Sequence, residues 1–248
     1  MRAGFYESDA ALAQYLLFHY GTPGQICPLL PEAHAACGFP ARCVSEPLRH
    51  IVLHERRRAL DLGCAVGRSS FELSRQFDEV VGIDFSERFI AAARQIGAER
   101  GVTIQAQREG LLTDEIRLEL PAGPDAGRVR FEQGDACALR HDLGTFDLVL
   151  MANLIDRLPD PLRCLAGLPG LIPSGGWLII TSPYTWLEDY TPREKWLVDE
   201  EGGTLGALEK ILAPAFTLRQ TLNLPFLIRE HRRKYQLSVA EASVWERI

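Results

Sequence analysis

Three carboxylates close short apolar runs in this chain of 248 residues. Asp61 lies in ALDLG, Asp84 ends VVGID and Asp135 ends FEQGD. Short apolar runs beside glycine are typical of buried parallel strands, whose carboxyl ends meet at one edge of a sheet. A carboxylate at that edge can accept hydrogen bonds from both hydroxyls of a ribose, and the spacing favours Asp84 for this role.

A loop of small residues, Gly63-Cys64-Ala65-Val66-Gly67, follows the first acidic run and precedes a helical stretch. Small residues let the backbone approach a ligand closely, and a helix N-terminus offers unpaired N–H groups. The dinucleotide fingerprint G-x-G-x-x-G is not met, because Ala65 replaces the second glycine and Arg68 the third. An NAD(P)-dependent oxidoreductase therefore stays an alternative that the missing glycine and the acid at Asp61 weaken.

The elements that position these residues alternate between short strands and helical periods from Arg58 onward. The order RALDLGC, SSFELSRQF, EVVGIDF, RFIAAARQIGAERG is β, α, β, α, which predicts a parallel sheet with helices on both faces. We expect an α/β, Rossmann-like fold of about seven strands. The later strands are expected at 129–134, 146–152, 176–181, 217–223 and 235–244, with helices near 162–168 and 205–212.

Two segments stand outside this alternation. Residues 1–57 are expected to form an N-terminal helical cap or lid on a core of residues 58–248. Its helices are predicted at 10–20, after Ser8 or Asp9, and at 45–55, with Ser45 as N-cap and Pro47 in the first turn. The segment at about 102–128 is too long for an ordinary connection and alternates apolar residues, so it predicts an inserted hairpin or flap.

The overall composition limits the function classes. There are 27 Lys and Arg against 33 Asp and Glu, a net charge of −6, which argues against wholesale binding of nucleic acid or anionic membranes. No stretch approaches the roughly 18 apolar residues of a membrane span, and the N-terminus lacks a signal-peptide pattern, so we expect a cytoplasmic protein. The six cysteines show no C-x-x-C pair or His/Cys cluster, so no metal is predicted and free thiols are expected.

The strand-end acids beside a glycine loop resemble the class I S-adenosylmethionine-dependent methyltransferases. The resemblance implies that Asp61, Gly63, Ala65 and Gly67 surround the methionine part, that Asp84 binds the ribose, and that Asp135 and Ala136 meet the adenine. The residues expected to bind the cofactor are Asp61, Gly63, Cys64, Ala65, Gly67, Asp84, Phe85, Asp135, Ala136, Asn153, Tyr20 and Arg42.

Longer motifs resemble a narrower family, the 4-mercaptohistidine N1-methyltransferases, which includes the methyltransferase domain at the C-terminus of ovothiol synthases. The motifs are Tyr6-Glu7, YLLFHYG (15–21), FPARC (39–43), FEQGDAC, ANLIDRLPDP (152–161), SPYTWLEDYTPREKWL (182–197) and FLIREHRRKYQLSVAEASVW. One departure is that residues 198–201 intervene before Gly202-Gly203. No iron-binding or formylglycine-type domain precedes the motifs, so the resemblance implies that a separate sulfoxide synthase and lyase supply the substrate.

The resemblance implies N-methylation of the imidazole ring of 5-thiohistidine, giving ovothiol A and S-adenosylhomocysteine. Because an imidazole is largely neutral at pH 7, its lone pair is available without a strong base, and residues should position rather than react. Asn153 and Tyr184 are the candidate catalytic residues. The candidate substrate-binding residues are Tyr6, His19, Arg42, Trp186 and Arg229; Arg42 would clamp a carboxylate of substrate or cofactor, and His19 and Tyr20 would close over the cofactor.

Two further alternatives stay open at this point. The core motifs identify the cofactor better than the acceptor, so methylation of another small molecule competes with the ovothiol interpretation. A non-catalytic module that binds S-adenosylmethionine is the other alternative, because the fold tolerates loss of chemistry. A nucleic-acid base methyltransferase would carry N-P-P-Y or D-P-P-Y after the fourth strand, whereas Asn153 is followed by Leu154-Ile155-Asp156.

Overall fold

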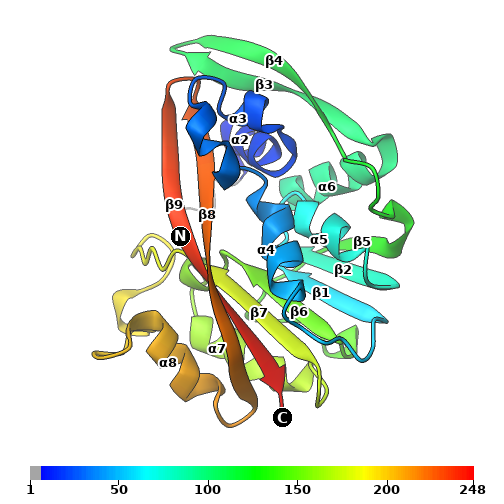
Figure 1. Cartoon of the computed structure of the whole chain (residues 1–248), viewed down its shortest axis with the longest axis vertical. Coiled ribbons are helices and arrows are strands. Elements are labelled where there is room, and N and C mark those ends of the chain that lie inside the picture. The colour runs from blue at the N-terminus through cyan, green and yellow to red at the C-terminus, as the bar shows by residue number, and fades with distance from the viewer. Residues whose placement is uncertain (1–6) are drawn as a thin grey trace.

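A seven-stranded sheet forms the centre of the computed structural model, which describes residues 7–248 (Figure 1). Its first five strands are parallel, and the last two are antiparallel to their neighbours. The predicted mostly parallel sheet of about seven strands is confirmed. In spatial order the strands are β5 (Val129–Gln133), β2 (Glu79–Asp84), β1 (Arg58–Leu62), β6 (Leu148–Ala152), β7 (Trp177–Ser182), β9 (Lys234–Arg247) and β8 (Phe216–His231).

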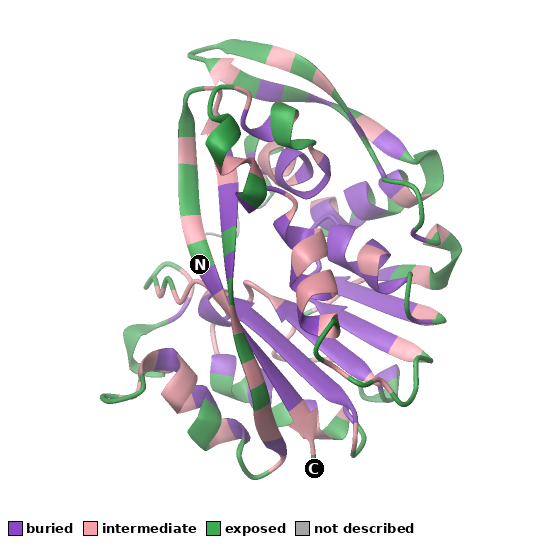
Figure 2. Ribbon diagram, viewed as in Figure 1, coloured by how far each residue is buried: buried purple, intermediate pink, exposed green. Residues whose placement is uncertain are grey.

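Helices cover both faces of this sheet, because alternate residues of each central strand point to opposite sides. Leu60 and Leu62 of β1 pack toward α7 (Pro161–Gly167) and α8 (Gly203–Leu212). Ala59 packs on the other face with α4 (Phe39–Leu48) and α5 (Arg68–Leu73), beside α6 (Glu87–Glu99). The central strands are therefore buried along nearly their whole length (Figure 2).

The predicted insertion is a separate two-stranded antiparallel sheet of β3 (Gly101–Glu109) and β4 (Leu112–Glu119). Ile104, Ala106 and Leu118 are buried in one apolar cluster with Leu16 and other residues of the N-terminal helix. The hairpin thus covers that helix, and the 3-10 turn η2 (Ala126–Arg128) returns the chain to β5. No helix among residues 7–248 is long and apolar enough to cross a membrane.

The N-terminal segment contains α2 (Asp9–Tyr20), α3 (Pro23–Ile26) and the 3-10 turn η1 (Pro31–Ala36) ahead of α4. As predicted, Ser8 caps α2, and its Oγ accepts a hydrogen bond from the N–H of Ala11 at 3.1 Å. The predicted helix at 45–55 is wrong. α4 begins at Phe39 because burying Phe39 and Val44 against the sheet stabilises the earlier start, which leaves Pro47 in the last turn. The division at residue 57 stays a prediction.

β8 and β9 are longer than predicted and leave the sheet together. β9 pairs with β7 only up to Glu241, opposite Ser182, whereas it pairs with β8 as far as Lys234 opposite His231. Residues 224–240 therefore form a two-stranded extension, here named the C-terminal ribbon, that rises beyond the carboxyl ends of the parallel strands (Figure 1).

Arg229 fastens this ribbon to the other two additions. Its Nη1 donates to the carbonyl of Gln25 at 3.0 Å, and its Nη2 donates to the carbonyl of Gln107 at 2.9 Å. Gln14 of α2 donates in turn to the Arg229 carbonyl at 3.1 Å. The N-terminal helices, the hairpin and the ribbon thus form one lobe above the strand ends.

Candidate cofactor and acceptor site

A cavity of about 420 Å³ lies between the strand ends and this lobe. One part of its wall comes from the loops after β1, β2, β5 and β6. The other part comes from α2, α4, the loop after β7 and the C-terminal ribbon. Strand-end residues in the wall include Gly63, Ala65, Asp84, Asp135 and Asn153; lobe residues include His19, Phe39, Phe226, Ile228, Gln236 and Ser238.

Asp84 is held rigidly at the end of β2 where it faces the cavity. Its Oδ2 accepts a hydrogen bond from the N–H of Ala65 at 2.8 Å, and its Oδ1 accepts from the N–H of Ser86 at 2.9 Å. Burial raises the pKa of this carboxyl to about 6, so it is ionised at pH 7. Each oxygen keeps a lone pair for a further donor, such as a vicinal diol.

The loop between β1 and α5 runs close to the cavity because its backbone adopts left-handed conformations. Gly63 has φ +78°, and a Cβ there would lie 2.7 Å from Cδ1 of Leu154. Ala65 has φ 48°, a conformation that costs about 1–2 kcal/mol for a residue with a side chain. Gly67 does not line the cavity; a Cβ there would lie 2.5 Å from Cζ of Phe131, so this glycine lets the loop pack against β5.

Asp61 lies beneath this loop and does not line the cavity. Its Oδ2 accepts hydrogen bonds from the hydroxyls of Ser69 at 2.9 Å and Ser70 at 2.6 Å, which fixes the first turn of α5. Oδ1 is buried with no hydrogen-bond partner in the described chain. Burial raises the pKa of the carboxyl to about 6 despite the two serine bonds. Asp61 is thus placed to position the loop.

Two further strand-end groups border the cavity. Asp135 is exposed, and its Oδ1 accepts from the N–H of Cys137 at 2.8 Å, beside Ala136. Phe85 lines the cavity with 63% of its surface exposed, which leaves an aromatic face open at the rim. An exposed aromatic ring beside a carboxylate suits a flat heterocycle that carries an amino group.

Asn153 begins the loop after β6 with φ 51° and lines the cavity. Its Oδ1 accepts from the hydroxyl of Thr181 at 3.2 Å, and its N–H donates to the Thr181 carbonyl at 2.8 Å. The side-chain NH₂ has no hydrogen-bond partner among residues 7–248. The amide is therefore oriented by β7 and keeps two donors for a ligand.

His19 reaches the cavity from α2. It is buried, and its Nδ1 has no partner in the part of the chain that the structure describes. Burial, together with the charge of the nearby Arg68 guanidinium, lowers the pKa of the imidazole to about 3. His19 is therefore neutral at physiological pH and is a poor proton acceptor.

Comparison with known proteins shows the class of domain in which this cavity lies. A methyltransferase domain model matches residues 60–180, from β1 to β7. Ajmaline N-methyltransferase of Rauvolfia serpentina is 24% identical over 215 residues, which cover 80% of this chain and 62% of that protein. Ubiquinone biosynthesis O-methyltransferase of Bordetella avium (strain 197N) is 25% identical over 126 residues, covering 51% and 42% respectively. The chain thus spans less than two thirds of the length of these curated relatives.

A solved structure shows the same fold. N-methyltransferase NodS from Bradyrhizobium japonicum WM9 has a TM-score of 0.54 at 15% identity, covering 84% of this chain and 96% of that one. This chain carries a class I S-adenosylmethionine-dependent methyltransferase domain. The cavity chemistry fits the cofactor, because Asp84 would accept the ribose hydroxyls and the Phe85 rim would take the adenine. S-adenosylmethionine supplies a methyl group on a cationic sulfonium.

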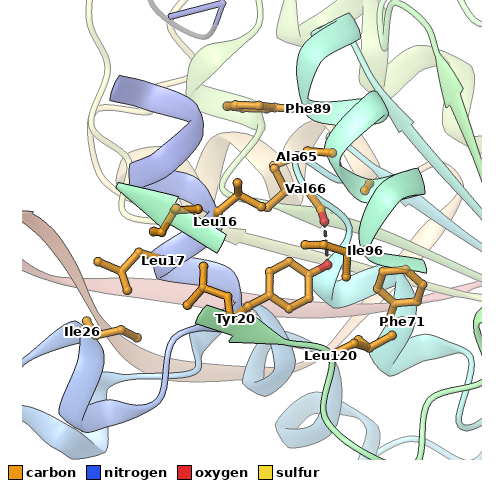
Figure 3. Packing of buried hydrophobic residues seen from close by; sticks show 14 of the residues in the cluster. Leu16, Leu17, Tyr20, Ile26, Ala65, Val66, Phe71, Phe89, Ile96 and Leu120 are labelled. Carbon is orange, nitrogen blue, oxygen red and sulfur yellow. Dashed lines mark hydrogen bonds between the residues drawn. The ribbon is translucent and has the colours of Figure 1, made fainter. Parts of the chain in front are cut away.

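Two residues expected to meet the cofactor of this methyltransferase point elsewhere. The Tyr20 hydroxyl donates to the Val66 carbonyl at 2.6 Å inside an apolar cluster (Figure 3). Arg42 lies outside the cavity wall, where its guanidinium donates to the carbonyls of Ala35 at 2.6 Å and Pro225 at 3.0 Å. Each polar group is thus committed to the backbone of the methyltransferase.

Three residues expected to meet the acceptor also lie outside the cavity wall. Tyr184 donates to Oε2 of Glu241 at 2.9 Å, and Trp186 Nε1 donates to the Thr204 hydroxyl at 3.0 Å. Arg229 is the fastener of the ribbon and is buried. Their long polar side chains span the gaps between elements, so they hold the methyltransferase together. Tyr6 lies outside the described residues.

Sequence reasoning missed several residues that do line the methyltransferase cavity. Gln236 and Ser238 stand two apart on β9 and share one face of the ribbon, as Phe226 and Ile228 do on β8. Their alternation is the signal that could have revealed them. Arg157 lies four residues after Asn153 in the same loop, within the motif ANLIDRLPDP, and was not singled out.

Proposed function

We propose that this methyltransferase methylates the imidazole of 5-thiohistidine at the ring nitrogen nearer the side chain, forming ovothiol A. The motif resemblance along most of the chain supports this acceptor, and the N-methyltransferase relative covers 80% of the chain. The observation that carries the proposal is the neutral His19. It is the one imidazole in the described cavity wall, and its pKa of about 3 makes it unable to take a proton near pH 7.

An acceptor without help from a base must already be nucleophilic in its neutral form. The unprotonated nitrogen of a neutral imidazole is, whereas a phenol with a pKa of about 10 is a weak nucleophile until it loses its proton. In the transfer, the ring nitrogen forms the N–C bond as the C–S bond breaks. The bonding pair stays on sulfur, giving S-adenosylhomocysteine, and the methylated ring releases the proton of its other nitrogen to water.

The chain's own residues then align the acceptor and exclude water. Asn153 lines the cavity, and the Thr181 hydroxyl binds its amide oxygen, which leaves the NH₂ group to orient the acceptor. Phe226 and Ile228 of the ribbon close the cavity from above with apolar surface. Holding two reactants in line can contribute about 7–11 kcal/mol at its limit, so positioning can supply most of the rate enhancement.

The test is an assay that couples formation of S-adenosylhomocysteine to a signal, with 5-thiohistidine, histidine or buffer alone. We expect product only with 5-thiohistidine, one added methyl by mass spectrometry, and the ring nitrogen assigned by NMR. The variant Asn153→Gly keeps the φ of 51° accessible and removes only the amide, so we expect a loss of turnover. Tyr184→Phe, outside the cavity, is its matched control.

Each outcome has a defined meaning. Turnover on histidine equal to that on 5-thiohistidine would contradict the thiol acceptor. Binding of S-adenosylmethionine with no turnover on any of the three would leave the fold and cofactor intact and refute the acceptor. Full activity of Asn153→Gly would remove the amide from the mechanism.

A further inference from the structure

Arg157 is the one residue lining the cavity that carries a permanent positive charge, within the described residues. It ends the 3-10 turn η4 (Ile155–Arg157) in the loop that also carries Asn153. The other titratable groups of that wall include the carboxyls of Glu7, Asp84 and Asp135, and His19 is neutral. An anionic group of a ligand would therefore have a single cationic partner.

Only one nitrogen of the Arg157 guanidinium, Nη1, is bound by the described chain. Its Nη1 donates to the carbonyls of Thr185 at 2.7 Å and Asp156 at 2.9 Å, and lies 3.0 Å from Oδ2 of Asp156. Asp156 is buried and accepts the N–H of Thr185 at 2.8 Å, so the loops after β6 and β7 are tied together. The ring of Tyr190 lies 5.0 Å from the guanidinium carbon and supports its face.

The opposite edge of the same guanidinium is open. Nε and Nη2 have no hydrogen-bond partner between residues 7 and 248, 26% of the side chain is exposed, and the residue lines the cavity. A group whose orientation is fixed by one nitrogen and by a stacked ring loses little entropy when its other two N–H groups bind a ligand. The structural role of Arg157 therefore uses Nη1 and leaves a planar two-donor edge.

We propose that the Nε–Nη2 edge of Arg157 binds the carboxylate of the acceptor, so that the cavity selects small acceptors that carry an amino-acid type carboxylate. The proposal deepens the proposed function and rests on it for the assignment of this cavity as the acceptor site. A planar guanidinium edge matches a carboxylate with two parallel hydrogen bonds. The cavity wall holds one cation, Arg157, and the carboxyls of Glu7, Asp84 and Asp135. Because these carboxyls repel negative charge, the cavity suits a ligand that is a monoanion or zwitterion better than a phosphate dianion.

This assignment replaces the arginines expected from the motifs. The guanidinium of Arg42 donates hydrogen bonds to the Ala35 and Pro225 carbonyls and to the Glu46 carboxylate. The two terminal nitrogens of Arg229 donate hydrogen bonds to the carbonyls of Gln25 and Gln107. Neither lines the cavity, whereas Arg157 does.

The test measures binding by calorimetry to the protein saturated with S-adenosylhomocysteine. The paired ligands are 5-thiohistidine and its decarboxylated analogue 5-thiohistamine. We expect the unmodified protein to prefer 5-thiohistidine by about 10- to 100-fold, and Arg157→Gln to lose that preference. Arg157→Lys should keep only part of it, since a point charge lacks the fork. The exposed Arg163→Gln should match the unmodified protein, and an unchanged affinity for S-adenosylhomocysteine shows that each variant is folded.

The comparison of the two ligands on the unmodified protein needs no variant. Equal binding of both, or a preference retained by Arg157→Gln, would overturn the proposal even if 5-thiohistidine is methylated. Should neither thiol compound bind, the same proteins are tested against the twenty L-amino acids and their decarboxylated amines. Carboxylate-dependent binding that Arg157→Gln removes would support the clamp while refuting 5-thiohistidine as acceptor, and binding of no amino acid would overturn the clamp.

Discussion

Replacing Asp84 by Asn removes one oxygen acceptor and the charge while keeping the size of the side chain. Two backbone N–H groups, of Ala65 and Ser86, converge on the two carboxylate oxygens. An amide has one oxygen, so one of these donors would face an NH₂ group. The carboxylate would also accept a ribose hydroxyl on each oxygen, and one charged hydrogen bond contributes about 1.5–3 kcal/mol. The loss predicts roughly 10- to 150-fold weaker binding of S-adenosylhomocysteine.

Calorimetric titration with S-adenosylhomocysteine between pH 5 and 8 measures this effect. Because the pKa of Asp84 is about 6, protonation on lowering the pH through 6 should weaken binding to the unmodified protein. Asp84→Asn should show no such dependence. Asp78→Asn is the control, since Asp78 lies exposed at the far side of α5 and pairs with Arg128. An affinity of Asp84→Asn within about threefold of the unmodified protein would refute the assigned role.

For three other substitutions, the structure predicts a change in the free energy of unfolding or in its pH dependence. Tyr184→Phe should lower the free energy of unfolding by about 1 kcal/mol, from loss of the Glu241 bond, with turnover unchanged; reduced turnover at full stability would contradict its structural role. Gly67→Ala should cost about 2–4 kcal/mol in urea unfolding, because φ is +86° and the new Cβ meets Phe131; an unfolding midpoint equal to the parent would refute the clash. The folded pKa of Asp61 is raised from 3.8 to about 6, so the folded state binds its proton more tightly and stability falls as pH rises from about 4 to 6. Asp61→Asn should remove up to about 3 kcal/mol of that fall, measured by unfolding at pH 4 and 7; an unchanged pH dependence would argue against it.

The parallel core was predictable because its strands are short, apolar and separated by helical periods. Only the β9 side of the C-terminal ribbon was predicted as a strand; residues 224–234 were not, since they contain REHRRK, a charged run typical of a solvated loop. Those residues form strands because Arg229 docks on backbone carbonyls of the N-terminal segment and of the hairpin, more than 100 residues away in the chain. The misplaced helix at 45–55 has a related cause: both Pro40 and Pro47 fit a first turn, and burial against the sheet decided between them.

Site residues could be predicted where their position at the end of a strand determines which way the side chain points. Asp84, Asp135 and Asn153 follow strand ends and all line the cavity, whereas Asp61 faces α5 because it lies within its strand. Long side chains could not be placed in this way. Arg42 and Arg157 have the same side chain. Their roles differ because backbone carbonyls bind both terminal nitrogens of Arg42 but only Nη1 of Arg157, which leaves Nε and Nη2 for a ligand.

The two parts of the cavity wall, the strand-end loops and the C-terminal ribbon, are synthesised at different times. A chain is synthesised from its N-terminus at about 5–20 residues per second. The residues of all five parallel strands have been synthesised once β7 ends at Ser182, so the strand-end loops around Asp84 are made before the ribbon. Phe226 and Gln236 then add the last wall, when Arg229 docks. A cofactor bound during synthesis would stabilise the half-made sheet by mass action, and the acceptor chamber would close around a donor already in place.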